Sequence, residues 1–179
     1  MWVIIAAILV LVITAVALLQ VYDSYKSGNT QMASQGLQQQ VGQVVAVILN
    51  TYAQNPNLTG FNGQVARQIG ALPSSWTGNA DPINLPNGGT VTFAAVTQGT
   101  APNPNAFTMT FKGLGKDACN ALGTFSLPQM VSVNVNNGGA TFVNPAYGQQ
   151  GTWPPVANTV AATCSANDGS DTVVYTIMG

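Results

Sequence analysis

Two ionisable residue types are missing from the 179 residues of this chain, which contains no His and no Glu. Both absences limit the chemistry, because His and Glu are among the commonest general bases and His occupies most catalytic zinc sites. The five Asp are spread along the chain without a paired spacing, and two Cys cannot close a structural zinc site by themselves. We therefore expect no catalytic residues, no metal site and no bound cofactor, and the chain is not predicted to be an enzyme.

Charge of either sign is scarce. Charged side chains make up 5% of the chain, against about 25% in an ordinary soluble domain, and the formal net charge is −1. Four scattered Lys and Arg cannot neutralise a phosphate backbone, so nucleic acid is not expected as a partner. Asn, Gln, Thr and Ser keep the surface hydrated without making it ionic. Such a surface repels identical neighbours only weakly, which favours a protein that is packed in an assembly.

A long apolar run opens the chain. Residues 2–19 contain one Thr and no charge, and at 1.5 Å per residue they are just long enough for a bilayer core, which needs about 20 residues. One interpretation is a cleaved signal peptide, since Ala15-Val16-Ala17 resembles a cleavage site. The run has no basic residues at its start, however, and it exceeds the roughly 7–15 apolar residues of a signal peptide. We therefore expect it to be retained, either as a membrane anchor or as a helix that becomes the core of a polymer.

The helix is predicted to continue beyond this apolar run. Pro is absent until Pro56, and after Gly28 the apolar residues recur at steps of three, four and seven, as on one face of a helix. These apolar positions are Met32, Leu37, Val41, Val44, Val45, Ile48, Leu49 and Tyr52. One helix of about 75–80 Å is thus predicted to run to about Thr51. The segment 27–30 (SGNT) is either a bend in this helix or a short linker.

The chain divides into two parts at this level. Residues 1–53 form the predicted helix, with 1–19 as the membrane or filament-core segment, and 54–179 form a globular head domain. Alternating residues predict strands at 90–96, 106–112, 130–136, 140–143 and 172–178, with a hairpin turn at Gly138-Gly139. Short helices are predicted at 63–71, with Val65 and Ile69 facing inward, and at 115–122. The fold class is therefore α+β, with the long N-terminal helix packed on one face of an antiparallel sheet.

Cys119 and Cys164 are the only cysteines. A domain exported from the cytoplasm meets oxidising surroundings, in which an even number of cysteines indicates a disulfide. Closing this loop would remove roughly 4 kcal/mol of unfolded-state entropy. The alternatives are two buried free thiols, or a redox-active pair, for which the C-x-x-C spacing is missing.

Together these features resemble a type IV pilin, and more closely the PilS-type major pilins of the type IVb group, found in conjugative pili. The resemblance covers nearly the whole chain. It rests on the apolar start, the polar-striped helix that ends at Tyr52, the segments IGALPSSWTG (69–78) and AFTMTFKGLGKDACNAL (106–122), and a late Cys before the last strand. It implies the type IV pilin fold, removal of a short basic leader by a prepilin peptidase, and processing and methylation at Met1.

Position 5 departs from the wider family. Most type IV pilins have Glu as the fifth mature residue, where it is thought to neutralise the N-terminal amine of a neighbour, whereas this chain has Ile5. Members of the conjugative branch lack that Glu, so the departure favours this branch. The charged amine of Met1 is then left to backbone carbonyls, to contacts tuned by methylation, or to lipid.

The function implied by the resemblance is that of the major subunit of a type IV, conjugative pilus that mediates cell–cell contact or adhesion. Subunits would wait in the inner membrane, and an assembly machinery would pack them into a homopolymer at the cell surface, with a tip adhesin minor pilin as a further candidate partner. The side chains expected in the filament core are Met1, Trp2, Val3, Ile4, Ile5, Ile8, Leu9, Leu11, Val12, Val16 and Leu19. The alternative is that these side chains contact only lipid.

Two rival functions use the same apolar segment. A membrane-anchored adhesin would stay monomeric, and a pseudopilin of a secretion system would build only a short piston. Trp76 and Trp153 are either exposed recognition residues or packing between loops, and packing is favoured. The segments 100–105 and 145–158 are candidates for the outer face of a filament, or plain connections.

Overall fold

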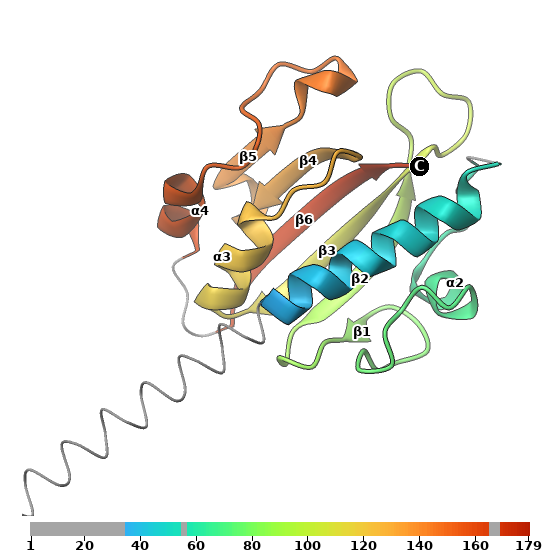
Figure 1. The fold of residues 1–179 in the computed structure, drawn as a ribbon, viewed down its shortest axis with the longest axis horizontal. Helices are drawn as coiled ribbons and strands as arrows, with labels where there is room; N and C mark the ends of the chain where they lie inside the picture. Colours follow the sequence, from blue (N-terminus) through green and yellow to red (C-terminus); the bar gives the residue numbers. More distant parts are fainter. Residues whose placement is uncertain (1–34, 55–56, 165–168) are drawn as a thin grey trace, which may run out of the picture. The chain divides into compact units, whose positions relative to one another are not determined.

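The computed structural model of the chain describes residues 35–54, 57–164 and 169–179. The first element is a helix over residues 35–52, drawn in blue to cyan in Figure 1. The elements that follow are α2 (Gly63–Gln68), β1 (Ile83–Asn84), β2 (Thr90–Val96), β3 (Ala106–Leu114), α3 (Lys116–Thr124), β4 (Met130–Val135), η1 (Asn136–Gly138), β5 (Ala140–Val143), η2 (Pro145–Tyr147), α4 (Ala157–Thr163) and β6 (Asp171–Met178). A helix followed by strands with short helices between them is the α+β fold that the sequence predicts.

The strands form one six-stranded sheet in the order β1-β2-β3-β6-β4-β5. Every neighbouring pair is antiparallel. The last strand, β6, lies in the middle of the sheet between β3 and β4, so both of its edges are hydrogen-bonded. The C-terminal end of the chain is therefore held by the sheet, as expected from a strand as the last element.

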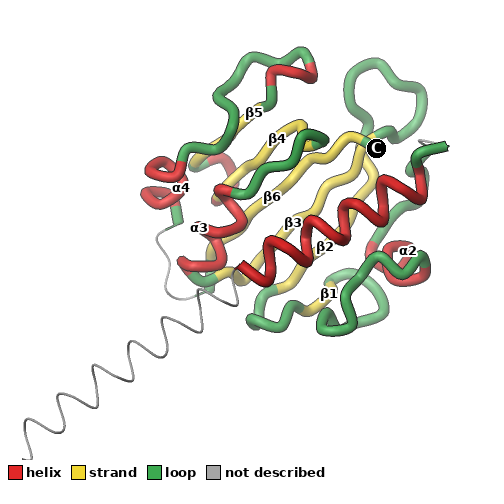
Figure 2. The backbone as a smooth tube through the Cα atoms, in the orientation of Figure 1, coloured by secondary structure: helices red, strands yellow, loops and turns green. Residues whose placement is uncertain are grey.

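The helix 35–52 and α3 lie over the same face of the sheet, in front of the strands in Figures 1 and 2. Leu37, Val41, Val44, Val45 and Ile48 are buried in one cluster with the inward side chains of the strands. They are the positions at which the sequence places the apolar stripe of the helix. Burying each such side chain stabilises the fold by about 1.5–3 kcal/mol relative to leaving it in water.

The inward face of the sheet follows the two-residue period of a strand. In β6 every second residue is buried, and in β3 the alternation brings Phe107, Met109 and Phe111 into the core. The aromatic rings meet edge to face, and Phe61 contacts Phe93 and Phe107 with ring centroids 6.0 and 5.5 Å apart. Such pairs add about 0.5–1.5 kcal/mol beyond the area they bury.

The predicted strands are confirmed, with shifted ends. β2 and β5 have the predicted bounds, β3 continues to Leu114, β4 ends at Val135, and β6 begins at Asp171. The hairpin between β4 and β5 is present, but its turn begins two residues earlier than the Gly138-Gly139 pair. Asn136 and Asn137 both adopt left-handed φ angles of 51° and 52° there, which Asn tolerates better than most residues.

The two short helices in the prediction are also present. α2 ends at Gln68 rather than at residue 71, because Gly70 takes a φ of 72° and Ala71 N donates to Ala66 O, an arrangement that closes a helix. Its fully buried residues are Gly63 and Ala66, while Val65 and Ile69 pack against the core but stay half-buried. The sequence did not predict β1 or α4, since two residues are too few for a periodic pattern and the seven residues of α4 include one Asn, two Thr and one Val, which favour helix less than Ala does.

The compact unit that contains the sheet spans Ser34–Gly179, so the helix 35–52 belongs to the same body as the strands. Among the described residues, no helix is both long and apolar enough to cross a membrane. The predicted apolar segment 1–19 and the segment 27–30 lie outside the described residues.

Candidate functional site

Two charged side chains, Arg67 and Asp81, form hydrogen bonds to backbone groups around α2 and β2. Arg67 donates from Nη2 to Trp76 O at 2.6 Å and to Gly78 O at 2.9 Å. Asp81 accepts hydrogen bonds from Gly63 N at 2.7 Å and from Phe93 N at 3.1 Å. Arg67 thus holds the segment between α2 and β2 by two of its carbonyls, and Asp81, within that segment, binds one backbone N–H of α2 and one of β2. Both residues therefore shape the connection between these two elements.

The two cysteines form the predicted disulfide. Cys119 comes from α3 and Cys164 follows α4, with Sγ atoms 2.02 Å apart and a separation of 45 residues. Both are fully buried, and the described part of the chain has no free cysteine. The alternative of two free thiols is therefore excluded. The bond closes a region that contains β4, η1, β5, η2 and α4.

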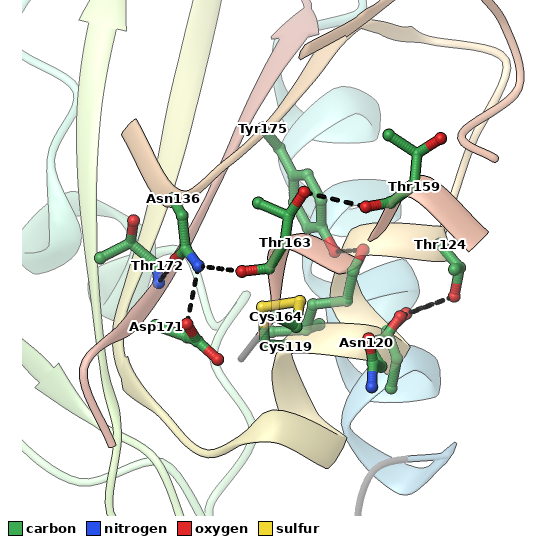
Figure 3. The surroundings of a disulfide bond; sticks show 12 residues. Cys119, Asn120, Thr124, Asn136, Thr159, Thr163, Cys164, Asp171, Thr172 and Tyr175 are labelled. Atoms are coloured by element: carbon green, nitrogen blue, oxygen red, sulfur yellow. Dashed lines mark hydrogen bonds between the residues drawn. A yellow bond between two sulfur atoms is a disulfide. The ribbon is translucent and has the colours of Figure 1, made fainter. Parts of the chain in front are cut away.

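Asn136 links two segments of the chain that meet beside the disulfide (Figure 3). Its Nδ2 donates to Thr163 O and to Asp171 Oδ1, both at 2.7 Å. Its Oδ1 accepts from Thr172 N at 2.8 Å. One side chain thus links the end of α4 to the start of β6. The sequence does not indicate this role beyond the Asn-Asn-Gly-Gly run at 136–139.

Asp171 is buried beside the disulfide, with 2% of its surface exposed. Asp171 and the two cysteines are the one group of three potential metal ligands among the described residues. The cysteine sulfurs are bonded to each other, so they offer no thiolate to a metal. The expectation that the chain has no metal site stays a prediction.

The helix 35–52 presents an uncharged face away from the core. Its exposed positions are Thr51 and a set that recurs at steps of three and four, namely Gln35, Gln39, Gln43, Ala46 and Asn50. Residues three and four apart lie on one side of a helix, so these side chains form one stripe, here called the glutamine stripe. An uncharged stripe can approach an identical surface without electrostatic repulsion.

The sheet face opposite the helix 35–52 is also nearly free of charge. Its half-buried side chains include Thr92, Thr108, Thr110, Ser132, Asn134 and Thr176. Lys112, at the end of β3, is exposed on the same side. The low charge of the chain is therefore also a property of this sheet face.

The two tryptophans discussed in the sequence analysis contribute to packing. Trp76 is 1% exposed, and its Nε1 donates to Gln40 Oε1 at 2.7 Å. Trp153 is half-buried against the core. Trp76 therefore connects the segment after α2 to the helix 35–52, and the packing interpretation is confirmed for both residues.

The segment 145–158 contains η2 and the start of α4 rather than a plain loop.

The residues expected in the filament core lie outside the described residues. They are Met1, Trp2, Val3, Ile4, Ile5, Ile8, Leu9, Leu11, Val12, Val16 and Leu19. Their packing, and the processing and methylation expected at Met1, remain predictions.

Comparison with known proteins supports the filament interpretation. The profile of the bundlin family matches residues 26–178. The chain belongs to the bundlin family. A solved structure with a similar fold is the type IVb pilin from Salmonella typhi, at a TM-score of 0.55 and 17% sequence identity, covering 85% of this chain and 99% of that pilin. A comparison with curated protein sequences found no match.

Membership in the bundlin family makes this chain a type IVb pilin, a structural protein and not an enzyme. Pilins polymerise with identical subunits by means of an assembly machinery, and they are located in a pilus at the cell surface. The glutamine stripe and the sheet face opposite the helix 35–52 are accordingly two of the surfaces of a filament subunit.

Proposed function

We propose that this chain is the major structural subunit of its pilus, and that it polymerises through its N-terminal helix. The glutamine stripe is the observation that supports this proposal most directly. It is a long exposed helix face without a charge, on the helix that follows the apolar segment. In a filament of packed helices, a charge on this face would have to be desolvated, whereas amides can exchange hydrogen bonds with water for bonds to a neighbour.

Before assembly, the apolar segment 1–19 is proposed to lie in the inner membrane after a prepilin peptidase has removed a leader. During assembly the same side chains leave lipid and pack against the helices of neighbouring subunits. Lipid is as apolar as a protein core, so this exchange is nearly neutral in free energy. Head-to-tail contacts that do not close into a ring then extend into a helical filament.

The subunit register in this filament is proposed to depend on side-chain shape. Ile5 offers no carboxylate to a neighbour's N-terminal amine. The amine of Met1 then relies on carbonyl oxygens, on methylation or on lipid. The same feature, with the resemblance at 69–78 and 106–122, supports a pilus that serves conjugation, with a tip adhesin minor pilin as partner.

The test is the yield of sheared surface fibres that contain this chain, measured by electron microscopy and immunoblotting. Ile5→Lys, and separately Gln39→Lys with Gln43→Lys, should each lower fibre yield at least about tenfold, since an unpaired charge in a packed interface costs several kcal/mol. Gln64→Lys, on an exposed position of α2, is the matched control and should leave the yield unchanged.

Each alternative has its own outcome in this experiment. Membrane-bound monomers without fibres would indicate an anchored adhesin, and short periplasmic fibres alone would indicate a pseudopilin. Normal fibres from the Lys variants would contradict packing through the helix. The conjugation role is tested by plasmid transfer from a fibre-deficient donor, and unchanged transfer would contradict it while leaving the pilin assignment intact.

A further inference from the structure

A buried carboxylate lies beside the disulfide in a position that packing alone does not explain. A carboxylate oxygen of Asp171 and the Sγ atoms of Cys119 and Cys164 all lie within 4.8 Å of one another. Asp171 Oδ1 is occupied by Asn136 Nδ2. Asp171 Oδ2, however, is buried and has no hydrogen-bond partner among the residues that the structure describes. Buried acceptors without a donor are rare in folded proteins, so this oxygen requires a reason.

A hydrogen-bond donor is present beside this carboxylate before the disulfide forms. In the reduced chain each Sγ carries a hydrogen, and a thiol can donate a weak hydrogen bond. The two sulfurs, 2.02 Å apart when bonded, must then move apart to van der Waals contact. One thiol can therefore turn toward the Asp171 carboxylate, an oxygen of which lies within 4.8 Å of both Sγ atoms.

We propose that Asp171 is the proton acceptor that promotes closure of the Cys119–Cys164 disulfide. An external disulfide oxidant first forms a mixed disulfide with one cysteine and releases one of its own sulfurs as a thiol. The other cysteine then passes its proton to the Asp171 carboxylate, and its thiolate attacks the sulfur of the first cysteine. The Cys119–Cys164 bond forms, the bond to the oxidant breaks, and the departing thiolate takes a proton from water.

The electrons and protons balance over these steps. Two cysteine thiols are oxidised, the disulfide of the oxidant is reduced to two thiols, and Asp171 returns its proton to solvent. An acceptor matters at neutral pH because only the thiolate attacks, and a thiol with an ordinary pKa of about 8.5 is mostly protonated there. The carboxylate raises the fraction of productive attacks without entering the product.

The positions in the chain fit a step that occurs during folding. Both sulfurs are buried in the finished domain, so an oxidant must act before the region closes. Cys164 precedes Asp171 by only seven residues. Asn136 holds the carbonyl of Thr163 and the carboxylate of Asp171 at the same time. Asp171 is thus held near Cys164 as soon as β4 pairs with β6, and α3 brings Cys119.

The experiment follows oxidative refolding of the full chain in detergent micelles. The reduced chain is mixed with glutathione disulfide, and samples are quenched with acid, alkylated and weighed by mass spectrometry. The decay of the glutathione-linked species gives the rate of closure. Asp171→Asn should slow closure at least about tenfold near pH 6.5, within the range of general-base effects, and the difference should vanish near pH 9, where thiolate forms without help.

Two further measurements separate this role from a structural one. If Asp171 only supports the fold, Asp171→Asn slows closure by the same factor at every pH, which would overturn the proposal, as would equal rates near pH 6.5. Asp117→Asn, which removes an exposed carboxylate two residues before Cys119, is the matched control and should not change the rate.

The wild-type chain alone provides an independent test should Asp171→Asn fail to fold. With Asp171 as acceptor, its closure rate should be nearly constant between about pH 5.5 and 6.5. Without such an acceptor, the rate follows the thiolate fraction and rises about tenfold per pH unit below the thiol pKa. A tenfold rise per unit in the wild type would overturn the proposal.

Discussion

Tyr175 is the ionisable side chain that the fold isolates most strongly from water. It lies in the central strand β6 with no exposed surface, and its hydroxyl donates to Leu122 O in α3 at 2.6 Å. Its ring contacts Phe111 and Phe125 at centroid distances of 5.4 and 6.3 Å. Burial raises the pKa of the Tyr175 hydroxyl well above its usual value. The folded state therefore keeps the proton that the unfolded state loses.

This pKa shift predicts a loss of stability in alkali. Below the unfolded-state pKa of about 10, Tyr175 is protonated in both states and its contribution is fully present. Above that pH the unfolded state binds fewer protons than the folded state, so the free energy of unfolding falls by up to about 1.4 kcal/mol per pH unit. Urea unfolding of the wild type and Tyr175→Phe from about pH 8 to 11 measures the effect.

The Tyr175→Phe variant isolates the hydroxyl group. It should lose about 0.5–1.5 kcal/mol at neutral pH, since the bond to Leu122 O is gone. Above pH 10 its stability should fall less steeply than that of the wild type. Parallel curves in that range would show that Tyr175 keeps an ordinary pKa.

The roles of some individual residues could be predicted from the sequence, and those of others could not. Cys119 and Cys164 were predictable, because a pair of cysteines in an exported domain has one simple outcome. Asn136 and Asp171 were not, since their roles depend on a left-handed turn and on the neighbouring positions of β4 and β6 in the sheet. The sequence shows neither, because strand order is set by packing between distant segments.

Among the elements, the helix 35–52 was the most predictable. Its buried positions follow the helical period, and no proline interrupts its interior, so the pattern alone predicts the helix. The strands were also recognisable by alternation. The position of β6 between β3 and β4 was not, because the period-two pattern shows which face is buried but not which strand is adjacent.

Two helix glycines should respond to alanine substitution in opposite directions. At Gly42, in the helix 35–52, an added Cβ would meet only Phe125 Cζ at 3.7 Å, which is ordinary contact. Gly42→Ala should therefore stabilise the fold by up to about 1 kcal/mol through helix propensity. At Gly63, in α2, the Cβ would lie 2.3 Å from Asp81 Oδ1. Gly63→Ala should destabilise by about 1–3 kcal/mol.

The cost at Gly63 arises because Asp81 cannot simply move away. Its two carboxylate oxygens hold Gly63 N and Phe93 N, so displacing the side chain breaks bonds to α2 and β2 together. Denaturant unfolding of both variants measures the two changes. A stabilising Gly63→Ala would show that Asp81 adapts freely, and a destabilising Gly42→Ala would contradict the open space beside that helix.

At the scale of the whole molecule, the low charge and the long helix both favour packing between copies of the chain. The net charge is −1, and the glutamine stripe and the outer sheet face are almost uncharged. Repulsion between copies is therefore weak, and shape and hydrogen bonding decide how they pack. Stability of the single subunit comes from elsewhere, namely the core between helix and sheet and the disulfide across 45 residues.

This separation predicts that folding and polymerisation can be uncoupled. A chain that begins at Ser34 keeps the compact unit Ser34–Gly179. It should fold cooperatively with its disulfide closed, and its free energy of unfolding should fall in the ordinary range of about 5–15 kcal/mol. It should remain monomeric in analytical ultracentrifugation, because the segment proposed as the filament core is gone. The full chain, treated identically after detergent removal, is the control and should form fibres. Fibres from the shortened chain would place the polymerising surface on the head, and failure of that chain to fold would show that the apolar segment is needed for the fold itself.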